Sequence, residues 1–220
     1  MPRVRIRFRK QGDARFISHL DLVRVMERAA RRAGLPLRLS QGYNPRPKMA
    51  FASALALGTA SDAEYLDLEL VRPVPLEDVL GRLREQLPSG LRPSAAAWVP
   101  EQAPALMALV NAAEYEVEVE FSGPCPGRAE LEQRLRDFVT RGGALDGELL
   151  ALAEGRARLR LVLPASGGDR ARPRRVAESL LSALGCGGRT AGVRRRELLR
   201  IEGGRRLVPW ELVQGGRARG

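Results

Sequence analysis

The nine residues 40–48, SQGYNPRPK, gather side chains that can contact a nucleic acid strand. They include one aromatic residue, two amides and two cations, namely Gln41, Tyr43, Asn44, Arg46 and Lys48. A tyrosine can stack on an unpaired base, amides can bond to base edges, and cations can contact phosphates. The two prolines restrict the backbone and remove two amide donors, which predicts a stiff loop. We therefore expect this loop to contact RNA, with a place in the core as the alternative for the tyrosine.

A second group of candidates surrounds the start of a predicted helix over residues 18–33. These candidates for RNA contact are Arg15, His19, Arg24 and Arg28. Ser18 and Asp21 have the spacing of a helix cap, and Gly34 follows the last residue with helical spacing. A solvated helix face is the alternative for the two helical arginines. Phe16, just before the helix, is expected in the core.

His19 is the single histidine of the chain and offers an enzymatic alternative. At a helix N-terminus the dipole disfavours the imidazolium, so the imidazole would stay neutral, as a general base requires. With Arg15, Arg46 and Lys48 as cations, it would make a metal-independent RNA endonuclease. A local packing or hydrogen-bonding role is the competing interpretation of His19, and the one we favour.

The sequence lacks the residues that other classes of catalytic site require. One histidine and two scattered cysteines cannot form the four-ligand zinc site of a structural zinc domain, and no cysteine cluster suits an iron–sulfur centre. There is no phosphate-binding glycine motif and no nucleophile elbow. We expect neither a metal nor a cofactor. Asp67 and Glu69, which share one face of a predicted strand, are interpreted as a solvated strand face.

The positive charge is unevenly distributed along the chain. The formal net charge of +11 divides into +10 for residues 1–48, −8 for 49–122 and +9 for 123–220. Such segregation favours a polyanionic partner over uniform basicity, although a solvated basic surface is an equal alternative. We expect the acidic stretch 62–78 and the strand 114–120 to face solvent or a protein, because carboxylates repel phosphate.

The elements that must position these residues follow one order twice. Alternation and helical spacing predict a β-α-β-β-α-β succession in each half of the chain. The predicted strands are 4–10, 36–40, 63–71, 91–99, 115–121, 148–155, 156–164 and 193–201, with 49–58 extended, and the helices are 18–33, 75–87, 128–141 and 173–185. The fold class is therefore α+β, with two tandem ferredoxin-like (βαββαβ) units. We expect the first unit in 1–100, a linker in 101–111, the second unit in 112–202 and a basic tail in 203–220.

The sequence also bears on the cellular compartment. No apolar run approaches the roughly 20 residues that a bilayer crossing needs, and the N-terminus lacks the apolar core of a signal peptide. We expect a cytoplasmic protein without membrane contact. Cys125 and Cys186 are then expected as free thiols.

The N-terminal third resembles a known family. Its matching words are Phe16-Ile17-Ser18-His19-Leu20-Asp21, Ser40-Gln41-Gly42-Tyr43-Asn44-Pro45 and Glu64-Tyr65 with Asp67. They are similar to the radical SAM-linked protein family, a bacterial domain of unknown function found beside radical SAM proteins or fused to them. The resemblance implies a separate radical SAM enzyme as partner, which would supply the iron–sulfur cluster. Arg46 stands where the family's pattern has a histidine, which weakens any catalytic role for this position and keeps a cationic contact.

Together these observations predict a non-catalytic RNA-binding module that acts with a radical SAM enzyme. The alternatives are a protein–protein adaptor for that enzyme without RNA binding, and the His19 endonuclease.

Overall fold

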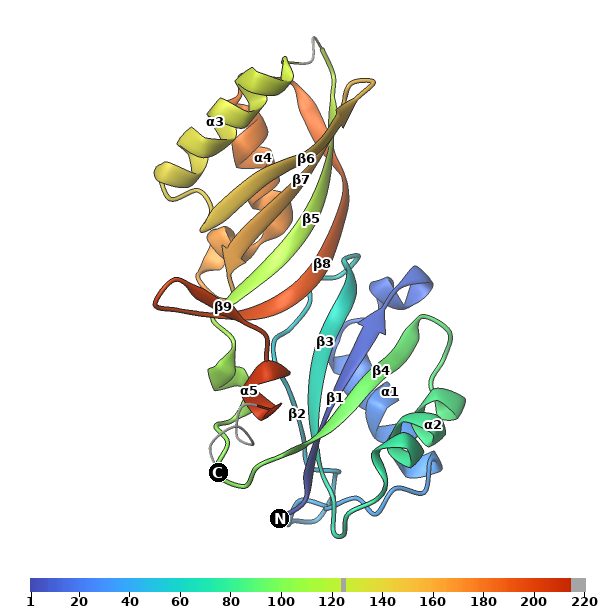
Figure 1. Ribbon diagram of the computed structural model, residues 1–220. Coiled ribbons are helices and arrows are strands. Elements are labelled where there is room, and N and C mark those ends of the chain that lie inside the picture. Colours follow the sequence, from blue (N-terminus) through green and yellow to red (C-terminus); the bar gives the residue numbers. More distant parts are fainter. Residues whose placement is uncertain (124–125, 215–220) are drawn as a thin grey trace. The chain divides into compact units, whose positions relative to one another are not determined.

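A computed structural model describes residues 1–123 and 126–214. The chain is a mixed α+β protein that divides into two compact units. Unit 1 consists of residues 1–110 with the described residues from 199 onward, and unit 2 consists of residues 111–198 (Figure 1). Strand β8 (Gly188–Glu202) supplies residues to both units.

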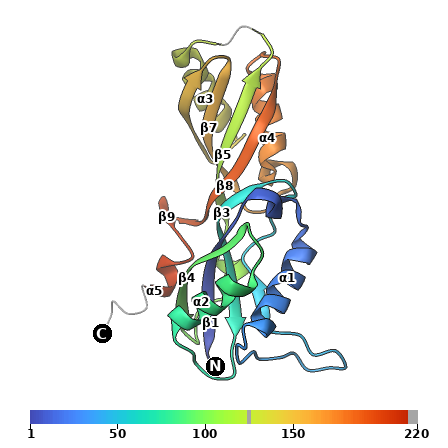
Figure 2. The same cartoon turned by 90° about the vertical axis from the view of Figure 1, so that its right-hand side faces the viewer.

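Unit 1 contains an antiparallel sheet with the strand order β4-β1-β3-β2. Helices α1 and α2 lie on one face of this sheet (Figure 2). The elements are β1 (Arg3–Lys10), η1 (Gly12–Phe16), α1 (His19–Arg32), β2 (Met49–Phe51), β3 (Ala60–Glu69), α2 (Leu76–Gln86), β4 (Leu91–Val99), η2 (Leu106–Leu109), β9 (Arg205–Leu207) and α5 (Glu211–Gln214).

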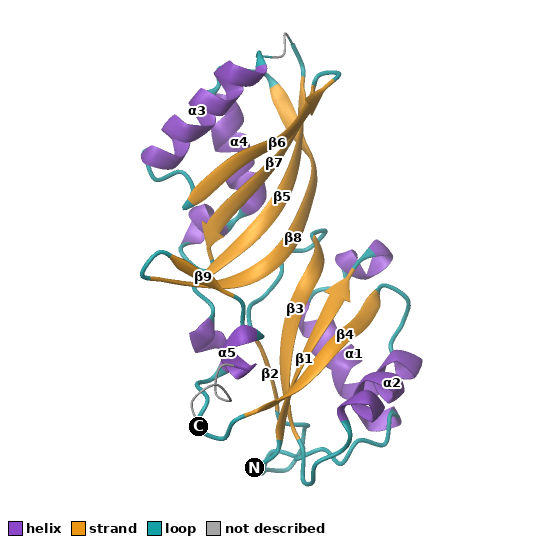
Figure 3. Ribbon diagram, viewed as in Figure 1, coloured by secondary structure: helices purple, strands orange, loops and turns teal. Residues whose placement is uncertain are grey.

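Unit 2 has the strand order β8-β5-β7-β6, and helices α3 and α4 cover one face of its sheet (Figure 3). Its elements besides β8 are β5 (Ala112–Phe121), α3 (Arg128–Thr140), β6 (Asp146–Ala153), β7 (Arg156–Pro164), η3 (Gly168–Ala171) and α4 (Pro173–Ala183). The predicted hairpin between β6 and β7 is confirmed, and Glu154 and Gly155 turn the chain with positive φ angles of 49° and 74°.

Helix α1 forms as its sequence predicts. The Ser18 hydroxyl accepts a hydrogen bond from the Asp21 amide at 3.1 Å, which satisfies one of the free donors of the first turn. Leu22 and Met26 recur at helical spacing and are buried against the sheet. Gly34, with φ of +61°, follows the helix in a conformation that costs glycine little.

Strand β1 alternates apolar residues with arginines, yet residues on both of its faces are buried. Val4 and Ile6 are buried as expected, but Arg5 on the opposite face is fully buried too. Its guanidinium donates to both carboxylate oxygens of Asp67, at 2.7 and 2.9 Å, and to the carbonyl oxygen of Pro209 at 2.9 Å. Alternation locates the two faces of a strand, but it does not show that a charged face meets its countercharge on a neighbouring strand.

Two other expected elements differ. The predicted strand 36–40 makes only isolated bridges, Leu37 with Leu70 and Leu39 with Pro47, because the chain leaves the sheet edge there. Of the predicted extended segment 49–58, only Met49–Phe51 pairs in the sheet. None of the described helices combines the length and the apolar character that a membrane crossing requires.

Of the two cysteines, Cys186 is a free thiol, as expected, whereas Cys125 lies outside the described residues. No group of three or more potential metal-binding side chains occurs within residues 1–123 and 126–214.

Candidate functional site

Residues 38–48, called the finger below, form a narrow loop that projects from unit 1 beside α1 (light blue in Figure 2). Its base continues the sheet pattern of β3. The Lys48 amide donates to the Arg38 carbonyl at 2.8 Å, and the Arg38 amide donates to the Glu69 carbonyl at 3.0 Å. The Glu69 amide in turn donates to the Lys48 carbonyl at 3.0 Å. The two ends of the finger are therefore fixed to a central strand.

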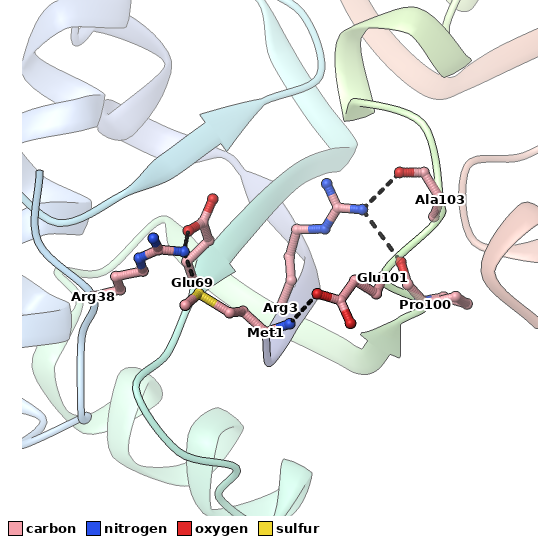
Figure 4. Close-up of polar contacts among 7 residues, drawn as sticks. All are labelled: Met1, Arg3, Arg38, Glu69, Pro100, Glu101 and Ala103. Atoms are coloured by element: carbon pink, nitrogen blue, oxygen red, sulfur yellow. Dashed lines mark hydrogen bonds and ion pairs between the residues drawn. The ribbon is translucent and has the colours of Figure 1, made fainter.

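Side chains strengthen this base. The Arg38 guanidinium donates to the Glu69 carboxylate at 3.1 Å and also contacts the sulfur of Met1 (Figure 4). Beside it, Arg3 holds the segment after β4 by donating to the carbonyl oxygens of Pro100 and Ala103 (Figure 4). Hydrogen bonds between side chains and backbone thus hold the residues at and beside the base of the finger in place.

The outer part of the finger is a tight hairpin. The Ser40 amide donates to the Arg46 carbonyl at 2.8 Å, and the Arg46 amide donates to the Ser40 hydroxyl at 3.0 Å. Gly42 has φ of +131°, a conformation that other residues rarely adopt. Helix α1 braces the hairpin, since the Arg31 guanidinium donates to the Pro45 carbonyl at 3.1 Å.

The tip presents side chains that have no partner in the described parts of the chain. Tyr43 is fully exposed, with 106% relative exposure, so a core position for this ring is wrong. Among the described residues, polar partners are also absent for the side chains of Gln41, Asn44 and Arg46, and for that of Lys48 at the base of the finger. A braced loop that leaves an aromatic ring and two cations unengaged is suited to binding something outside the chain.

The exposed face of α1 extends this surface. Leu20, Arg24, Arg28 and Arg31 follow one another at spacings of four, four and three residues, and all are exposed. Such spacing places them on one side of the helix. Arg24 pairs with Asp21 at 3.2 Å in an exposed contact that holds it weakly. Arg28 has no polar partner among the described residues.

The structure does not bring His19 beside the finger. The finger contacts Arg31, and the twelve helical steps from His19 to Arg31 span about 18 Å at the helical rise of ~1.5 Å per residue. His19 instead packs edge-to-face against Phe51, with the ring centroids 5.3 Å apart. This contact supports the packing role of His19, and the geometry gives no support to a catalytic pairing with Arg46.

Phe16 does not occupy the core, contrary to the expectation from sequence. Its relative exposure is 56%, and the Arg15 guanidinium carbon lies 4.6 Å from the centre of its ring. Phe16 ends the short helix η1, and the next residue, Ile17, packs against the core in its place. The apolar residue Ile17 beside it is the sequence signal that could have predicted an exposed Phe16. Sequence reasoning also missed Arg31, which braces the finger.

The acidic segments are not uniformly solvent-facing as predicted. Asp67 and Glu64 are each 3% exposed, so the expected solvated strand face is wrong for Asp67. Asp67 is buried because Arg5 neutralises it at 2.7 Å. Buried carboxylates stay in the interior when such a partner compensates the lost hydration.

In unit 2, the glutamates of β5 face arginines on the adjacent strands. The acidic residues are Glu114, Glu116 and Glu120, and their partners are Arg156, Arg158, Arg160, Arg189 and Arg196. Partial burial lowers the pKa of Arg160, but hydrogen bonds to Glu148 and Asp146 outweigh it and raise this pKa above its usual value. Much of the basic charge of unit 2 is therefore already compensated, unlike that of the finger and α1.

Three solved structures similar to this chain are of Cbf5–Nop10 or H/ACA complexes. One is a chain of an archaeal box H/ACA sRNP Nop10-Cbf5 complex, with 15% identity and a TM-score of 0.53, covering 87% of this chain and 46% of that one. A chain of a Cbf5-Nop10-Gar1 complex has 14% identity and a TM-score of 0.54, with 89% and 48% covered. A chain of an H/ACA RNP bound to a substrate RNA has 14% identity and a TM-score of 0.52, with 87% and 46% covered. At such identities the likeness shows the fold alone, and this chain spans less than half the length of each of these three chains.

No curated protein matches the sequence. Residues 3–145, which contain the finger, α1 and all strands of the first sheet, match the family described as uncharacterized protein conserved in bacteria. The chain therefore belongs to the DUF2344 family of uncharacterized bacterial proteins.

Proposed function

We propose that this protein binds RNA through the finger and the exposed face of α1. The observation that carries the proposal is the fully exposed Tyr43 on a braced hairpin with unpartnered Gln41, Asn44 and Arg46. An aromatic ring, amides and cations together provide stacking, base-edge contacts and phosphate contacts. Arg15, His19, Arg24, Arg28 and Lys48 complete the proposed surface.

The strand order and the similar solved structures both support RNA binding. In both units the first strand of the β-α-β-β-α-β succession lies between the fourth and the third, with the second at the edge, which is the basis for proposing two ferredoxin-like units. We keep the limits 1–100, 101–111 and 112–202 as the proposed domain division. Ferredoxin-like modules are among the folds that bind single-stranded RNA. The similar solved chains belong to RNA–protein complexes, which agrees with RNA binding without establishing it.

A radical SAM enzyme as partner is a further part of the proposal. It rests on the resemblance of residues 15–70 alone. In this proposal the protein is cytoplasmic and delivers RNA to the separate enzyme. An adaptor without RNA binding is the competing function, and the exposed apolar Phe16, Leu20 and Leu57 are the observation in its favour.

The test is RNA binding by the full chain, measured by fluorescence anisotropy of a labelled RNA at several salt concentrations. We expect the double variant Arg46→Ala, Lys48→Ala to weaken binding. The slope of log K against log salt is negative, and each phosphate contact to a single strand contributes about −0.7 to it. Loss of two contacts should therefore make the slope shallower by about 1.4.

The matched control removes two other cations, Arg92→Ala with Arg174→Ala, which lie outside the proposed surface. Both are exposed, and neither has a polar partner among the described residues. Equal weakening by the control would show nonspecific attraction by net charge. Wild-type protein that binds no RNA, or binds it without a salt slope, would sink the proposal.

A further inference from the structure

An exposed apolar cluster lies at the end of α1 that is distant from the finger. Phe16 in η1, Leu20 in α1 and Leu57 in the loop before β3 are 56, 60 and 64% exposed. Exposed apolar side chains that lie together commonly serve contact with a partner.

The backbone around Phe16 is well fixed. The Gly58 amide donates to the Arg15 carbonyl at 2.9 Å, which ties η1 to the loop that carries Leu57. The Ile17 carbonyl accepts from the Nζ of Lys10 at 2.8 Å, and the Lys10 side chain is itself buried. The exposure of Phe16 is thus imposed by the surrounding structure, and the ring is ready to bind without prior ordering.

Arg15 adds to this cluster a planar cation that can stack on a nucleobase. Its guanidinium lies over the Phe16 ring at 4.6 Å, which is the range of a cation–π contact. A planar guanidinium stacked on one ring can accept a base on its other side, and its charge suits the adjoining phosphate. A purely apolar protein partner would instead have to desolvate this charge.

The arginines of α1 connect this cluster with the finger. From Leu20 to Arg31 the helix rises about 17 Å, and Arg24 and Arg28 lie between them on the same side. Arg31 contacts the finger at Pro45, and the finger carries Tyr43. An aromatic position thus lies at each end of a row of cations. Proteins that bind single-stranded nucleic acid combine these two features, because bases stacked inside a duplex cannot reach aromatic side chains.

We propose that the partner is single-stranded RNA that runs along α1, with one base stacked at Arg15 and Phe16 and another at Tyr43. This inference rests on the proposed RNA binding and adds the strandedness of the RNA and a second stacking position. The strand spans the row of cations, so its phosphates lie along Arg24 and Arg28.

The experiment compares a labelled, unstructured 12-nucleotide RNA with the duplex of the same sequence, by anisotropy with the full chain. The single strand should bind at least about tenfold more tightly. Phe16→Ala should weaken its binding about 5- to 100-fold, since the stack of base, Arg15 guanidinium and aromatic ring loses its ring, while the salt slope stays unchanged because no charge is removed.

Two variants separate base stacking from apolar docking. Phe16→Leu keeps an apolar side chain and loses the ring, so it should weaken RNA binding about as much as Phe16→Ala. Met107→Ala, at a side chain that is 68% exposed elsewhere in unit 1, should change nothing. Because Phe16 is exposed, its variants should retain the wild-type melting temperature to within a few degrees.

The outcomes also separate the two proposals. RNA binding that is unaffected by Phe16→Ala, or is equal for the strand and the duplex, would overturn this inference and leave the finger proposal intact; the cluster would then belong to a protein partner. Absence of any RNA binding would defeat both.

Discussion

The buried pair of Arg5 and Asp67 should be the most sensitive point of unit 1. Their side chains are 0 and 3% exposed, and two hydrogen bonds of 2.7 and 2.9 Å join them. Replacing Asp67 by alanine leaves the guanidinium buried with a single carbonyl partner, that of Pro209. Removing one member of a buried ion pair typically costs about 3–5 kcal/mol, because the remaining charge is uncompensated.

We expect Asp67→Ala to lower the free energy of unfolding by about this amount in urea titrations monitored by circular dichroism. For a protein of this size, ~1 kcal/mol corresponds to about 2–4 °C in melting temperature, so the decrease should be roughly 6–20 °C. Replacing both residues, Arg5→Met with Asp67→Leu, should recover most of the loss, since apolar residues of similar volume often substitute for a buried pair. Measured with the single variants Arg5→Met and Asp67→Leu, this double variant completes a double-mutant cycle that gives the coupling of the two side chains.

An exposed ion pair serves as control. Arg82 and Asp78 lie 3.2 Å apart on α2 with side chains 47 and 44% exposed, and Asp78→Ala should cost well under 1 kcal/mol. A loss below about 1 kcal/mol for Asp67→Ala, or a double variant less stable than the single one, would refute the view that an uncompensated charge dominates.

Three further outcomes follow from local geometry. Gly90→Ala should reduce the free energy of unfolding by about 1–3 kcal/mol or more in urea titrations, since a Cβ would lie 2.4 Å from the Gln11 carbonyl oxygen and φ is +91°. Ser18→Ala should cost about 1 kcal/mol in the same assay, because α1 loses its cap. The N-terminal ammonium of Met1, by its hydrogen bond and its charge, lowers the pKa of Glu101 below the usual 4.5, so NMR titration should show a midpoint that N-terminal acetylation raises. This contact favours the folded state above pH 4.5 and is lost as the pH falls through the lowered value.

The order of helices and strands could be predicted from the sequence, because alternation, helical spacing, caps and turns are properties of short segments. Ser18, Gly34 and the turn at Glu154 and Gly155 are short-range signals, and the structure contains the corresponding cap and turns. Burial of charge could not be predicted in this way. Arg5 meets Asp67 only through strand register, and these residues are 62 positions apart.

The finger could be predicted from the sequence, whereas the residues that surround it could not. Proline spacing indicated a stiff loop, and the unpartnered tip agrees with the chemistry inferred for Tyr43 and Arg46. The support by Arg31 and the separation from His19 depend on where the finger returns relative to the helix axis. That is a tertiary property, and the sequence of the loop does not specify it.

Arginines occur in both units, yet the distribution of ion pairs favours one face of unit 1 for the proposed RNA surface. On β7, Arg156, Arg158 and Arg160 each meet a glutamate of β5, so a phosphate there would have to displace carboxylates that are fixed in the sheet. Displacing a carboxylate from an arginine exchanges one charge-assisted contact for another and gains little. Arg28 and Arg46, by contrast, have no carboxylate partner among the described residues. A phosphate bound there displaces only dissolved counterions, so binding gains the full entropy of ion release. The strength of RNA binding should therefore follow these uncompensated cations and not the formal charge of +11.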